Sequence, residues 1–543
     1  MKVLCTKRRG YEWTNSEKGC FRGYVQVSGG IVLRGREAVE YFAQATDFES
    51  FQRLLQTIDG CFSVIVTKGK KTWAAVDIAR SMPLYYSSDC AVISDSSEAI
   101  RAEKAISKEN TDKLRMLEMY ATSYVVHENT LYKDIKQIEL GCAAEFTDEN
   151  CKIAPYFVHK AEIQNISREE AKAKLARLTD EMLDRILKVV GGRRIVISLS
   201  GGYDSRYLAC SLKQHGIDDV ICYTYGKDAS FEIRQSKKVA EALGYEWHCV
   251  EYTDDKIKNI LSEGNKAYFD YCNGHDYTLY LQNYIAVREL KEQGVLPDSA
   301  VFLTGLCNDM PTGSYFPAES ELTSEHFNNR CVAEWLYNMR FVRFKLSEKM
   351  REIYISETIK KLDFWGLAVK DYQSFVSAED CMDTGYSHSR CFLNMNKSHE
   401  FFGYEWLLPC WDRNLLKFWY SLPAEYRYKQ NLYEEYITEV LAAKYGVGTK
   451  KQLALHGKTT FIVNLKRFIG GWLVRIAYPL GIPIRRSADI NNFAPLEVVY
   501  YKNIKQKNAI KSERAALTLL QTIYLMEQRY GKKWYGYIKR ELR

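Results

Sequence analysis

The sequence predicts an α/β protein in which a β-rich N-terminal region is followed by a parallel sheet covered by helices. Up to about residue 160, short runs of β-branched and aromatic residues alternate with polar turns, a pattern typical of antiparallel strands. From about residue 168 to residue 450, apolar strand segments alternate with amphipathic helices. Because such alternation is typical of parallel sheets with both faces covered, we expect the second region to form such a sheet.

Length and composition place the chain among ordinary folded proteins. Its 543 residues suffice for two or three domains, with 46% hydrophobic and 27% charged residues. The 15 cysteines are scattered, never spaced C-x-x-C and odd in number, so we expect free thiols and a cytoplasmic location. The N-terminus lacks the apolar run of a signal peptide, and no stretch of about 18 apolar residues predicts a transmembrane segment.

The strand predictions in the N-terminal region rest on short apolar segments. These lie at residues 61–66, 72–76, 84–86, 91–93 and 135–146, the last long enough for a strand pair. A polar turn at 68–71 joins the first two. Beyond a polar boundary, Ser167-Arg-Glu-Glu170 is a capping-box candidate that opens a helix with apolar residues at helical spacing.

Four apolar segments predict the parallel sheet of the second region. They lie at residues 195–199, 220–225, 247–250 and 301–304. Residues 231–243 have helical spacing and end at Gly244, a typical C-terminal cap, and the segment from about 330 to 445 is expected to be helical. Ligands of such sheets bind beyond the carboxyl ends of the strands, and Asp204 and Asp309 both follow such ends.

The most informative segment is residues 195–210, IVISLSGGYDSRYLAC. Gly201 and Gly202 allow a tight turn and a close approach to a ligand, and the following helix presents unpaired N–H groups to an anion. Asp204 would repel a bare phosphate but is explained if Mg²⁺ lies between its carboxylate and phosphate oxygens. The alternative is that Asp204 only caps the helix. The sequence G-x-x-x-x-G-K-[ST] does not occur, so the loop is not a Walker A motif.

The net charge of +8 is concentrated near the C-terminus, where residues 456–543 hold 17 Lys and Arg against 5 Asp and Glu. One interpretation is a surface for nucleic acid, anionic lipid or an anionic substrate, and the other is a solvated helical face. Because no nucleic-acid-binding motif accompanies the charge, we expect no nucleic-acid partner. Residues 461–483 are largely apolar but are interrupted by Lys466, Arg467 and Arg475, and we expect them to pack against the protein, with an interfacial helix as the alternative.

With these segments in order, the chain resembles the asparagine synthetase superfamily, which includes β-lactam synthetase and lasso-peptide cyclases. The resemblance covers about residues 55–445. Its segments are Asp59-Gly-Cys-Phe-Ser-Val-Ile-Val, residues 75–86, residues 93–98, residues 131–141, the S-G-G-x-D-S loop at 200–205, and Glu405-Trp-Leu-Leu-Pro-Cys-Trp-Asp followed by Ser421-Leu-Pro. The loop resembles the pyrophosphate loop of ATP pyrophosphatases, and the shared order of the segments makes coincidence an inadequate explanation.

The resemblance implies three regions. Residues 1–160 are expected to form an Ntn-hydrolase-like domain similar to class II amidotransferase glutaminases. Residues 168–450 are expected to form a PP-loop ATP pyrophosphatase domain of the adenine nucleotide α-hydrolase-like type, and residues 451–543 a basic extension. Family glutaminases use a Cys exposed by removal of the initiator Met, but here position 2 is Lys2. We therefore expect no glutaminase activity, and we expect Cys5 to be a buried small residue rather than a nucleophile.

The resemblance also implies an activity, that of an asparagine synthase-like carbon–nitrogen ligase using ATP and Mg²⁺. A carboxylate of a small molecule, sugar or peptide would attack ATP to give an acyl-adenylate and pyrophosphate, and ammonia or a substrate amine would then form the amide and release AMP. Family precedent is compatible with a homodimer. Two alternatives remain open: a non-catalytic homologue that binds nucleotide or a partner, and adenylation that serves another nucleophile such as a thiol.

The resemblance assigns roles to particular residues. Asp204 and Asp309 are the expected Mg²⁺ ligands. The expected nucleotide-binding residues are Ser198, Leu199, Ser200, Gly201, Gly202, Tyr203, Asp204, Ser205, Tyr225 and Gly305. Leu306 stands where the family has a catalytic Glu, so the expected base is Glu405 or the substrate amine itself. Lys450 or Lys451 is expected to contact pyrophosphate, with a solvated surface pair as the alternative. Arg206 is a candidate for phosphate or substrate contact, and Arg390 and Asn394 for lining the substrate pocket.

Overall fold

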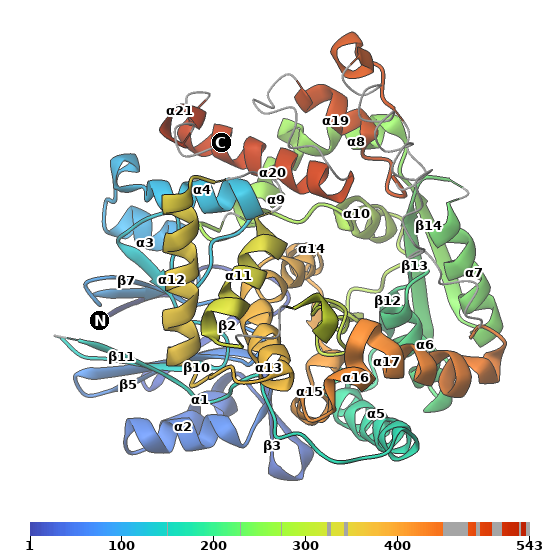
Figure 1. The fold of residues 1–543 in the computed structure, drawn as a ribbon, viewed down its shortest axis with the longest axis horizontal. Coiled ribbons are helices and arrows are strands. Elements are labelled where there is room, and N and C mark those ends of the chain that lie inside the picture. The colour runs from blue at the N-terminus through green and yellow to red at the C-terminus, as the bar shows by residue number, and fades with distance from the viewer. Residues whose placement is uncertain are drawn as a thin grey trace.

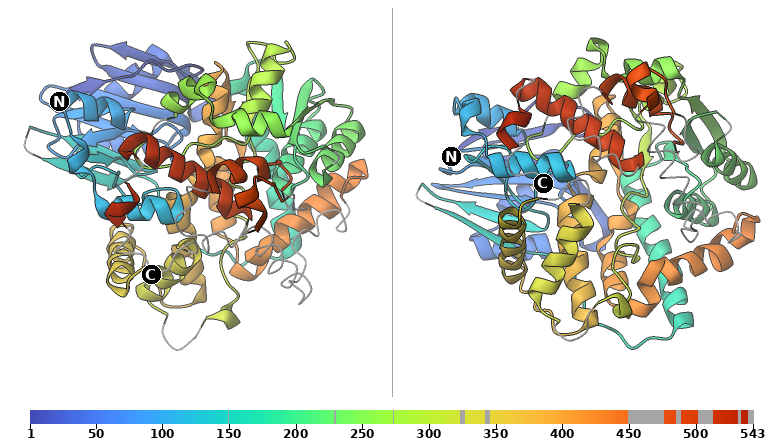
Figure 2. Two further views of the ribbon diagram at one scale, coloured as in Figure 1. Left: turned by 90° about the horizontal axis from the view of Figure 1, so that it is seen from above. Right: turned by 45° about the horizontal axis from the view of Figure 1, so that its top comes forward.

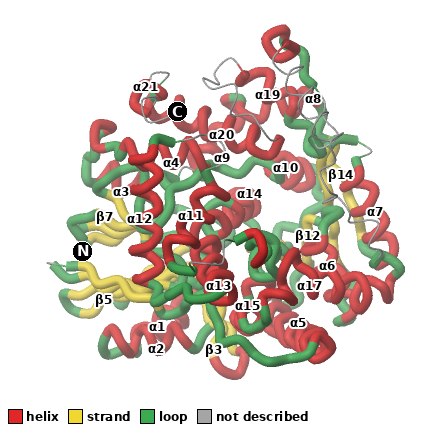
Figure 3. Tube along the Cα trace, in the orientation of Figure 1, coloured by secondary structure: helices red, strands yellow, loops and turns green. Residues whose placement is uncertain are grey.

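A computed structural model describes residues 1–148, 150–228, 230–272, 274–322, 327–341, 346–448, 476–484, 489–501, 513–531 and 534–538. Its strands form two groups on opposite sides of the molecule, one in the N-terminal region and one in the middle of the chain (Figures 1 and 3). Helices from residues 329–435 lie between them. The predicted α/β class is confirmed, with a parallel sheet in the second region.

The N-terminal region contains two sheets. The larger has the order β11-β10-β6-β5-β3-β2, with β4 also pairing with β3, and is antiparallel. Its strands are β2 (Trp13–Ser16), β3 (Gly19–Val27), β4 (Ile31–Arg34), β5 (Asp59–Lys68), β6 (Lys71–Val76), β10 (Cys142–Phe146) and β11 (Cys151–Pro155). The smaller sheet has the order β1-β8-β7-β9, formed by β1 (Lys2–Leu4), β7 (Tyr85–Ser87), β8 (Val92–Ser94) and β9 (Ile135–Gln137).

Alternation of side chains along the strands stacks these sheets into four layers. On β6, Trp73 and Ala75 face the core shared with helices α1 (Gly35–Ala43) and α2 (Phe48–Gln56). Ala74 and Val76 face the opposite way, into the core shared with the smaller sheet. The far side of the smaller sheet packs against α3 (Ser97–Glu103) and α4 (Lys113–Thr122). The period of two along a strand therefore gives a helix–sheet–sheet–helix arrangement.

The second region contains a five-stranded sheet in the order β14-β13-β12-β15-β16, with every pair parallel. Its strands are β12 (Ile195–Ser198), β13 (Val220–Gly226), β14 (Glu246–Glu251), β15 (Val301–Leu303) and β16 (Glu405–Leu407). Contacting helices α6 (Tyr203–Gln214) and α7 (Phe231–Leu243) cover one face, and α10 (Tyr284–Glu292) and α14 (Asn396–Phe401) cover the other (Figure 1). Strand β16 lies within the segment from about 330 to 445 that was expected to be helical, so that expectation is wrong at this point. A strand of three residues is too short to give a recognisable sequence pattern.

Local capping agrees with the sequence in two places and corrects it in a third. Ser167 and Glu170 form the predicted capping box of α5 (Arg168–Val190), and α7 ends at Gly244 with a φ of +69°. Helix α6 begins after Gly202, and no side chain caps it. The alternative that Asp204 serves as the helix cap is therefore wrong.

The remaining helices fill the space between the two groups of strands and cover one end of them. They are α8 (Asp254–Lys258), α9 (Lys266–Tyr271), α11 (Asn329–Arg340), α12 (Glu348–Phe364), α13 (Tyr372–Asp383), α15 (Arg413–Tyr420), α16 (Ala424–Arg427), α17 (Asn431–Glu435), α19 (Ala494–Tyr501), α20 (Glu513–Tyr530) and α21 (Tyr535–Ile538). Helices α20 and α21 contact α4, and α19 contacts α8, so the described part of the C-terminal extension packs on the protein (Figure 2). In the described ranges no helix has the length and hydropathy of a membrane span.

Buried ion pairs connect the N-terminal region to the rest of the chain. Arg22 of β3 binds Glu400 of α14 at 2.5 Å, and both side chains are almost inaccessible. Arg80 binds Asp276 at 2.8 Å, again with both side chains buried. Removing one member of such a pair leaves the other charge buried, so these contacts fix the two regions relative to each other.

Candidate nucleotide and acyl-transfer site

The loop after β12 is closed by its own hydrogen bonds. The N–H of Leu199 donates to the carbonyl of Tyr223 at 2.8 Å, which extends the pairing with β13 by one residue. The N–H of Ser200 donates to Oγ of Ser205 at 3.0 Å, and the N–H of Gly202 donates to Oγ of Ser200 at 3.1 Å. The two serines of the S-G-G-x-D-S sequence therefore hold the turn that the glycines permit.

The N–H of Gly201 faces an anionic group. It donates to Oε2 of Glu232, in the first turn of α7, at 2.5 Å. A Cβ at position 201 would lie 3.1 Å from the same oxygen, so the glycine lets the loop approach α7 closely. The contact shows that this amide is oriented to bind a carboxylate or phosphate oxygen. Glu232 was not predicted, although an acidic residue early in the helix after the next strand was a visible signal.

Asp204 and Asp309 meet at the carboxyl edge of the parallel sheet. Asp204 lies in the first turn of α6, and Asp309 follows β15. Burial, followed by the charge of Asp309, raises the pKa of Asp204 well above its usual range, so the two carboxyl groups lie close enough to interact. Gly305 makes the approach feasible, because a Cβ there would lie 3.0 Å from the backbone of Asp204.

Neutral side chains orient both carboxylates. The hydroxyl of Tyr433 donates to Oδ1 of Asp204 at 3.0 Å and accepts from Nδ2 of Asn308 at 2.7 Å. The hydroxyl of Tyr315 donates to Oδ2 of Asp309. In the described residues Asp204 has no cationic partner within ion-pair distance. A site with like charges and oxygen donors suits a hard cation such as Mg²⁺.

The two aspartates do not form a complete protein cage for a metal. Across the described ranges no three His, Cys, Asp or Glu side chains are grouped so that they would hold an ion. Mg²⁺ commonly binds through one or two carboxylates and completes its coordination with substrate phosphates and water. The donor set therefore fits Mg²⁺ delivered with a nucleotide.

The other predicted nucleotide-binding residues lie at the same edge of the sheet. Ser198 ends β12, and Tyr225 lies near the end of β13, where its ring stacks on that of Tyr252 with centroids 5.1 Å apart. Tyr203 opens α6, with its ring 6.4 Å from that of Tyr433. The structure therefore brings together the predicted set from Ser198 to Ser205 with Tyr225 and Gly305.

Glu405 does not belong to this group. It pairs in register with Val301, the first residue of β15, and so lies at the amino edge of the sheet. Its carboxylate binds Arg34 at 2.8 Å and Arg193 at 2.9 Å. The prediction that Glu405 is the base is not supported by its position, since parallel strands place their two ends at opposite edges. Lys450 and Lys451 lie outside the described residues.

Three other candidates, Arg206, Arg390 and Asn394, make hydrogen bonds to backbone carbonyls. Arg206 is buried and donates to the carbonyls of Val447 at 2.7 Å and Gly201 at 3.3 Å, so it stabilises the loop by joining it to residue 447. Arg390 is buried and donates to backbone carbonyls of the N-terminal region, and Asn394 donates to the carbonyl of Arg390. Sequence reasoning missed this because a buried Arg and a phosphate-binding Arg look alike in one sequence.

Cys5 has the environment of a protonated thiol. It is partly buried just after β1, and a hydrogen bond with Cys20, followed by burial, raises its pKa above the usual range. The thiolate is the reactive form of cysteine, so this environment does not favour a nucleophile.

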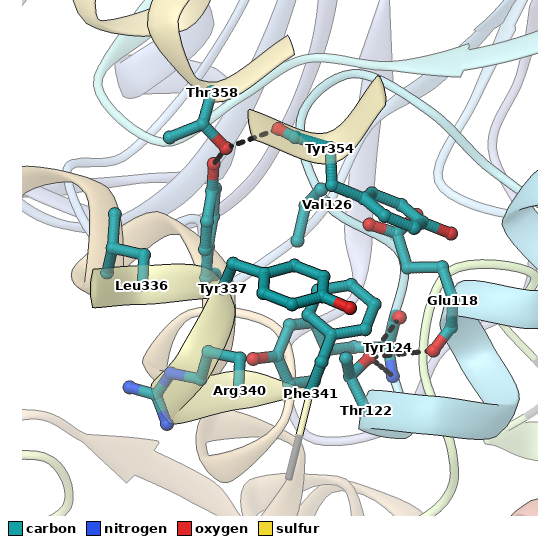
Figure 4. Close-up of a pocket in the computed structure, with 11 residues that line it drawn as sticks. Glu118, Thr122, Tyr124, Val126, Leu336, Tyr337, Arg340, Phe341, Tyr354 and Thr358 are labelled. Carbon is teal, nitrogen blue, oxygen red and sulfur yellow. Dashed lines mark hydrogen bonds between the residues drawn. The ribbon is translucent and has the colours of Figure 1, made fainter. Parts of the chain in front are cut away.

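A small cavity elsewhere in the protein is lined mainly by aromatic rings. It lies between α4 and helices α11 and α12, with Glu118, Tyr337 and Phe341 among its lining residues (Figure 4). Burial raises the pKa of Glu118 to about 7. Arg340 also lines it, but its guanidinium points away from the rings and binds Asp383 (Figure 4). None of the predicted site residues lines this cavity.

A glycine-containing loop and two neighbouring carboxyl groups at the carboxyl edge of a parallel sheet are typical of nucleotide-binding α/β proteins. Residues 178–445, close to half of the chain, match the family described as Asparagine synthase. The match suggests an ATP-dependent carbon–nitrogen ligase that takes a carboxylate substrate and ammonia or an amine. The comparison with curated proteins gives no match.

Proposed function

We propose that this protein is an AMP-forming amide ligase that activates a carboxylate as an acyl-adenylate. The observation that carries the proposal is the convergence of Asp204 and Asp309 beside the S-G-G-x-D-S loop. The loop amides and the start of α6 suit the pyrophosphate of ATP. Two carboxylates suit the Mg²⁺ that accompanies it.

The chemistry consists of two steps. In the first, a carboxylate oxygen bonds to the α-phosphorus of ATP, and the bond to pyrophosphate breaks. In the second, a nitrogen bonds to the acyl carbon and the bond from that carbon to the AMP oxygen breaks. AMP leaves with the electron pair, and the surplus proton of the nitrogen passes to water. The protein contributes mainly orientation and charge stabilisation, which is how enzymes accelerate such transfers.

The same proposal gives roles to the regions of the chain. We assign residues 168–450 to a PP-loop ATP pyrophosphatase domain and residues 1–160 to an Ntn-hydrolase-like domain without glutaminase activity. The four layers of the N-terminal region support this assignment, as does Lys2 in place of a Cys. The nitrogen donor is then ammonia or a substrate amine. The acceptor carboxylate belongs to a small molecule, sugar or peptide.

The competing hypothesis is a non-catalytic homologue that binds nucleotide or a partner. Leu306 favours it, because the position after Gly305 carries no carboxylate. The neighbouring pair Asp204 and Asp309 disfavours it, since two like charges held close together are costly to keep without a cation to bind.

The test is carboxylate-dependent release of pyrophosphate from Mg-ATP. Aspartate, uronic acids and small peptides would be assayed with and without ammonium chloride. Asp204→Asn and Asp309→Asn remove one charge each at constant size, and Glu405→Gln is the matched control at the other edge of the sheet. We expect the wild type and the Glu405→Gln control to release pyrophosphate, and we expect both aspartate variants to lose this release. ATP binding without release for every acid would favour the non-catalytic hypothesis.

A further inference from the structure

His388 is a buried imidazole beside Asp309 that the proposed chemistry does not yet use. It ends a π-helical turn, Thr384–His388, that follows α13. Such turns are rare and occur frequently at functional sites. The ring lies between two aromatic neighbours, Tyr315 and Phe392, with centroids 5.3 Å away in each case. These contacts fix the plane of the imidazole.

The groups around Nδ1 determine the tautomer. Oγ of Ser387 lies 3.1 Å from Nδ1, and the carbonyl and Oδ2 of Asp383 lie at 3.4 and 3.5 Å. Asp383 is itself in an ion pair with Arg340. Because a carbonyl and a carboxylate are acceptors, Nδ1 carries the hydrogen and Nε2 presents a lone pair.

The other ring nitrogen, Nε2, is a hydrogen-bond acceptor and lies near a carboxylate oxygen, which is also an acceptor. In the described part of the chain it has no hydrogen-bond partner, and the nearest charged atom is Oδ1 of Asp309 at 3.8 Å. A buried acceptor that receives no hydrogen bond is unfavourable. A ligand that places an N–H group against both Nε2 of His388 and Oδ1 of Asp309 would supply the missing donor.

The position of His388 is relevant to Leu306, which stands where the family resemblance leads us to expect a catalytic Glu. Cys307, the next residue, places its thiol 3.9 Å from the carbonyl of His388. The imidazole therefore lies beside the segment in which the family resemblance expects a Glu. Mg²⁺ prefers oxygen ligands to an imidazole nitrogen, so a nitrogen-bearing substrate suits this acceptor better than the metal does.

We propose that His388 binds the nitrogen donor, with Nε2 accepting a hydrogen bond from an N–H of ammonia or of a substrate amine. This inference rests on the proposed amide-ligase function. The hydrogen bond orients the nitrogen lone pair toward the acyl carbon. His388 then acts after adenylation, whereas Asp204 and Asp309 act in adenylation itself.

The experiment separates the two half-reactions in the full-length protein. ATP–pyrophosphate exchange, driven by the acid found to be active, measures adenylation. Amide formation against ammonium chloride concentration measures the second step. The main variant is His388→Phe, which keeps a ring between Tyr315 and Phe392 but has no lone pair. His388→Gln, which retains a side-chain acceptor, is the conservative variant.

For His388→Phe we expect exchange within about threefold of the wild type, and amide formation lowered about 10- to 100-fold with a raised KM for ammonium, the effect of losing one hydrogen bond to substrate. His388→Gln is expected to recover part of the loss. Equal losses in both half-reactions, or weaker Mg-ATP binding in a titration, would assign His388 to the metal site or to the fold and overturn the inference. Unchanged amide formation would also overturn it. Wild-type protein without exchange for any acid would instead refute the proposed function.

Discussion

The close approach of Gly305 to Asp204 gives the sharpest prediction about the site. A Cβ at position 305 would lie 3.0 Å from the backbone C and O of Asp204 and 3.1 Å from its Cβ. Carbon atoms pack best at about 3.5 to 4.0 Å, so the first turn of α6 would have to move by about 0.5 Å. Overpacking of this kind costs about 1–3 kcal/mol of folding free energy. The same movement displaces the carboxylate that faces Asp309.

We therefore expect Gly305→Ala to fold but to lose about 10- to 100-fold in pyrophosphate release, because small displacements of reacting groups are costly to catalysis. Pyrophosphate release and thermal unfolding would be measured on the same samples, and a Tm lower by a few degrees is expected. Gly264→Ala is the matched control, since a Cβ there meets only Oγ of Ser262 at 3.7 Å. Full activity of Gly305→Ala at an unchanged Tm would refute the reasoning.

Other contacts predict different effects. Glu405→Gln should leave pyrophosphate release within about threefold of the wild type, because position 405 is at the amino edge of the sheet, and a tenfold loss would contradict that placement. Arg427 binds buried Asp380 through hydrogen bonds of 2.7 and 2.8 Å, so Arg427→Met should lower the free energy of unfolding by about 3–5 kcal/mol, and a wild-type urea midpoint would disprove this. Burial lowers the pKa of His159 to about 4. An unfolded His titrates near 6.5, so the unfolded state binds the proton more readily than the folded state. His159 should therefore lower the free energy of unfolding by on the order of 2 kcal/mol as the pH falls from 7 to 5. His159→Gln should flatten that pH dependence, and an unchanged slope in urea unfolding would contradict the assignment.

The N-terminal region has a structural role that is independent of any glutaminase activity. Its Arg34 binds Glu405, and its Arg22 binds Glu400, so two of its cations hold the strand and helix at one side of the parallel sheet.

Strongly periodic segments were predictable because their information is local. Helix α7 has the predicted bounds, and Gly244 ends it, since helical spacing and a left-handed cap are visible within fifteen residues. The same holds for the loop at 200–205, whose glycines and aspartate occur together in the sequence. The seven-stranded sheet was less visible, because β2, β3 and β4 carry mixed polar and apolar residues.

The sequence by itself determined the class of fold, the strand–loop–helix at residues 195–210 and the proximity of Asp204 and Asp309, because strand ends at one edge of a parallel sheet are neighbours by topology. Only the tertiary structure decided which distant side chains join them. It placed Glu405 at the opposite edge of the sheet and showed that Arg206 and Arg390 bind backbone carbonyls inside the protein. It also brought His388 and Glu232 to the site. Such contacts depend on register and burial between segments far apart in the chain, and a single sequence does not encode these at any fixed spacing.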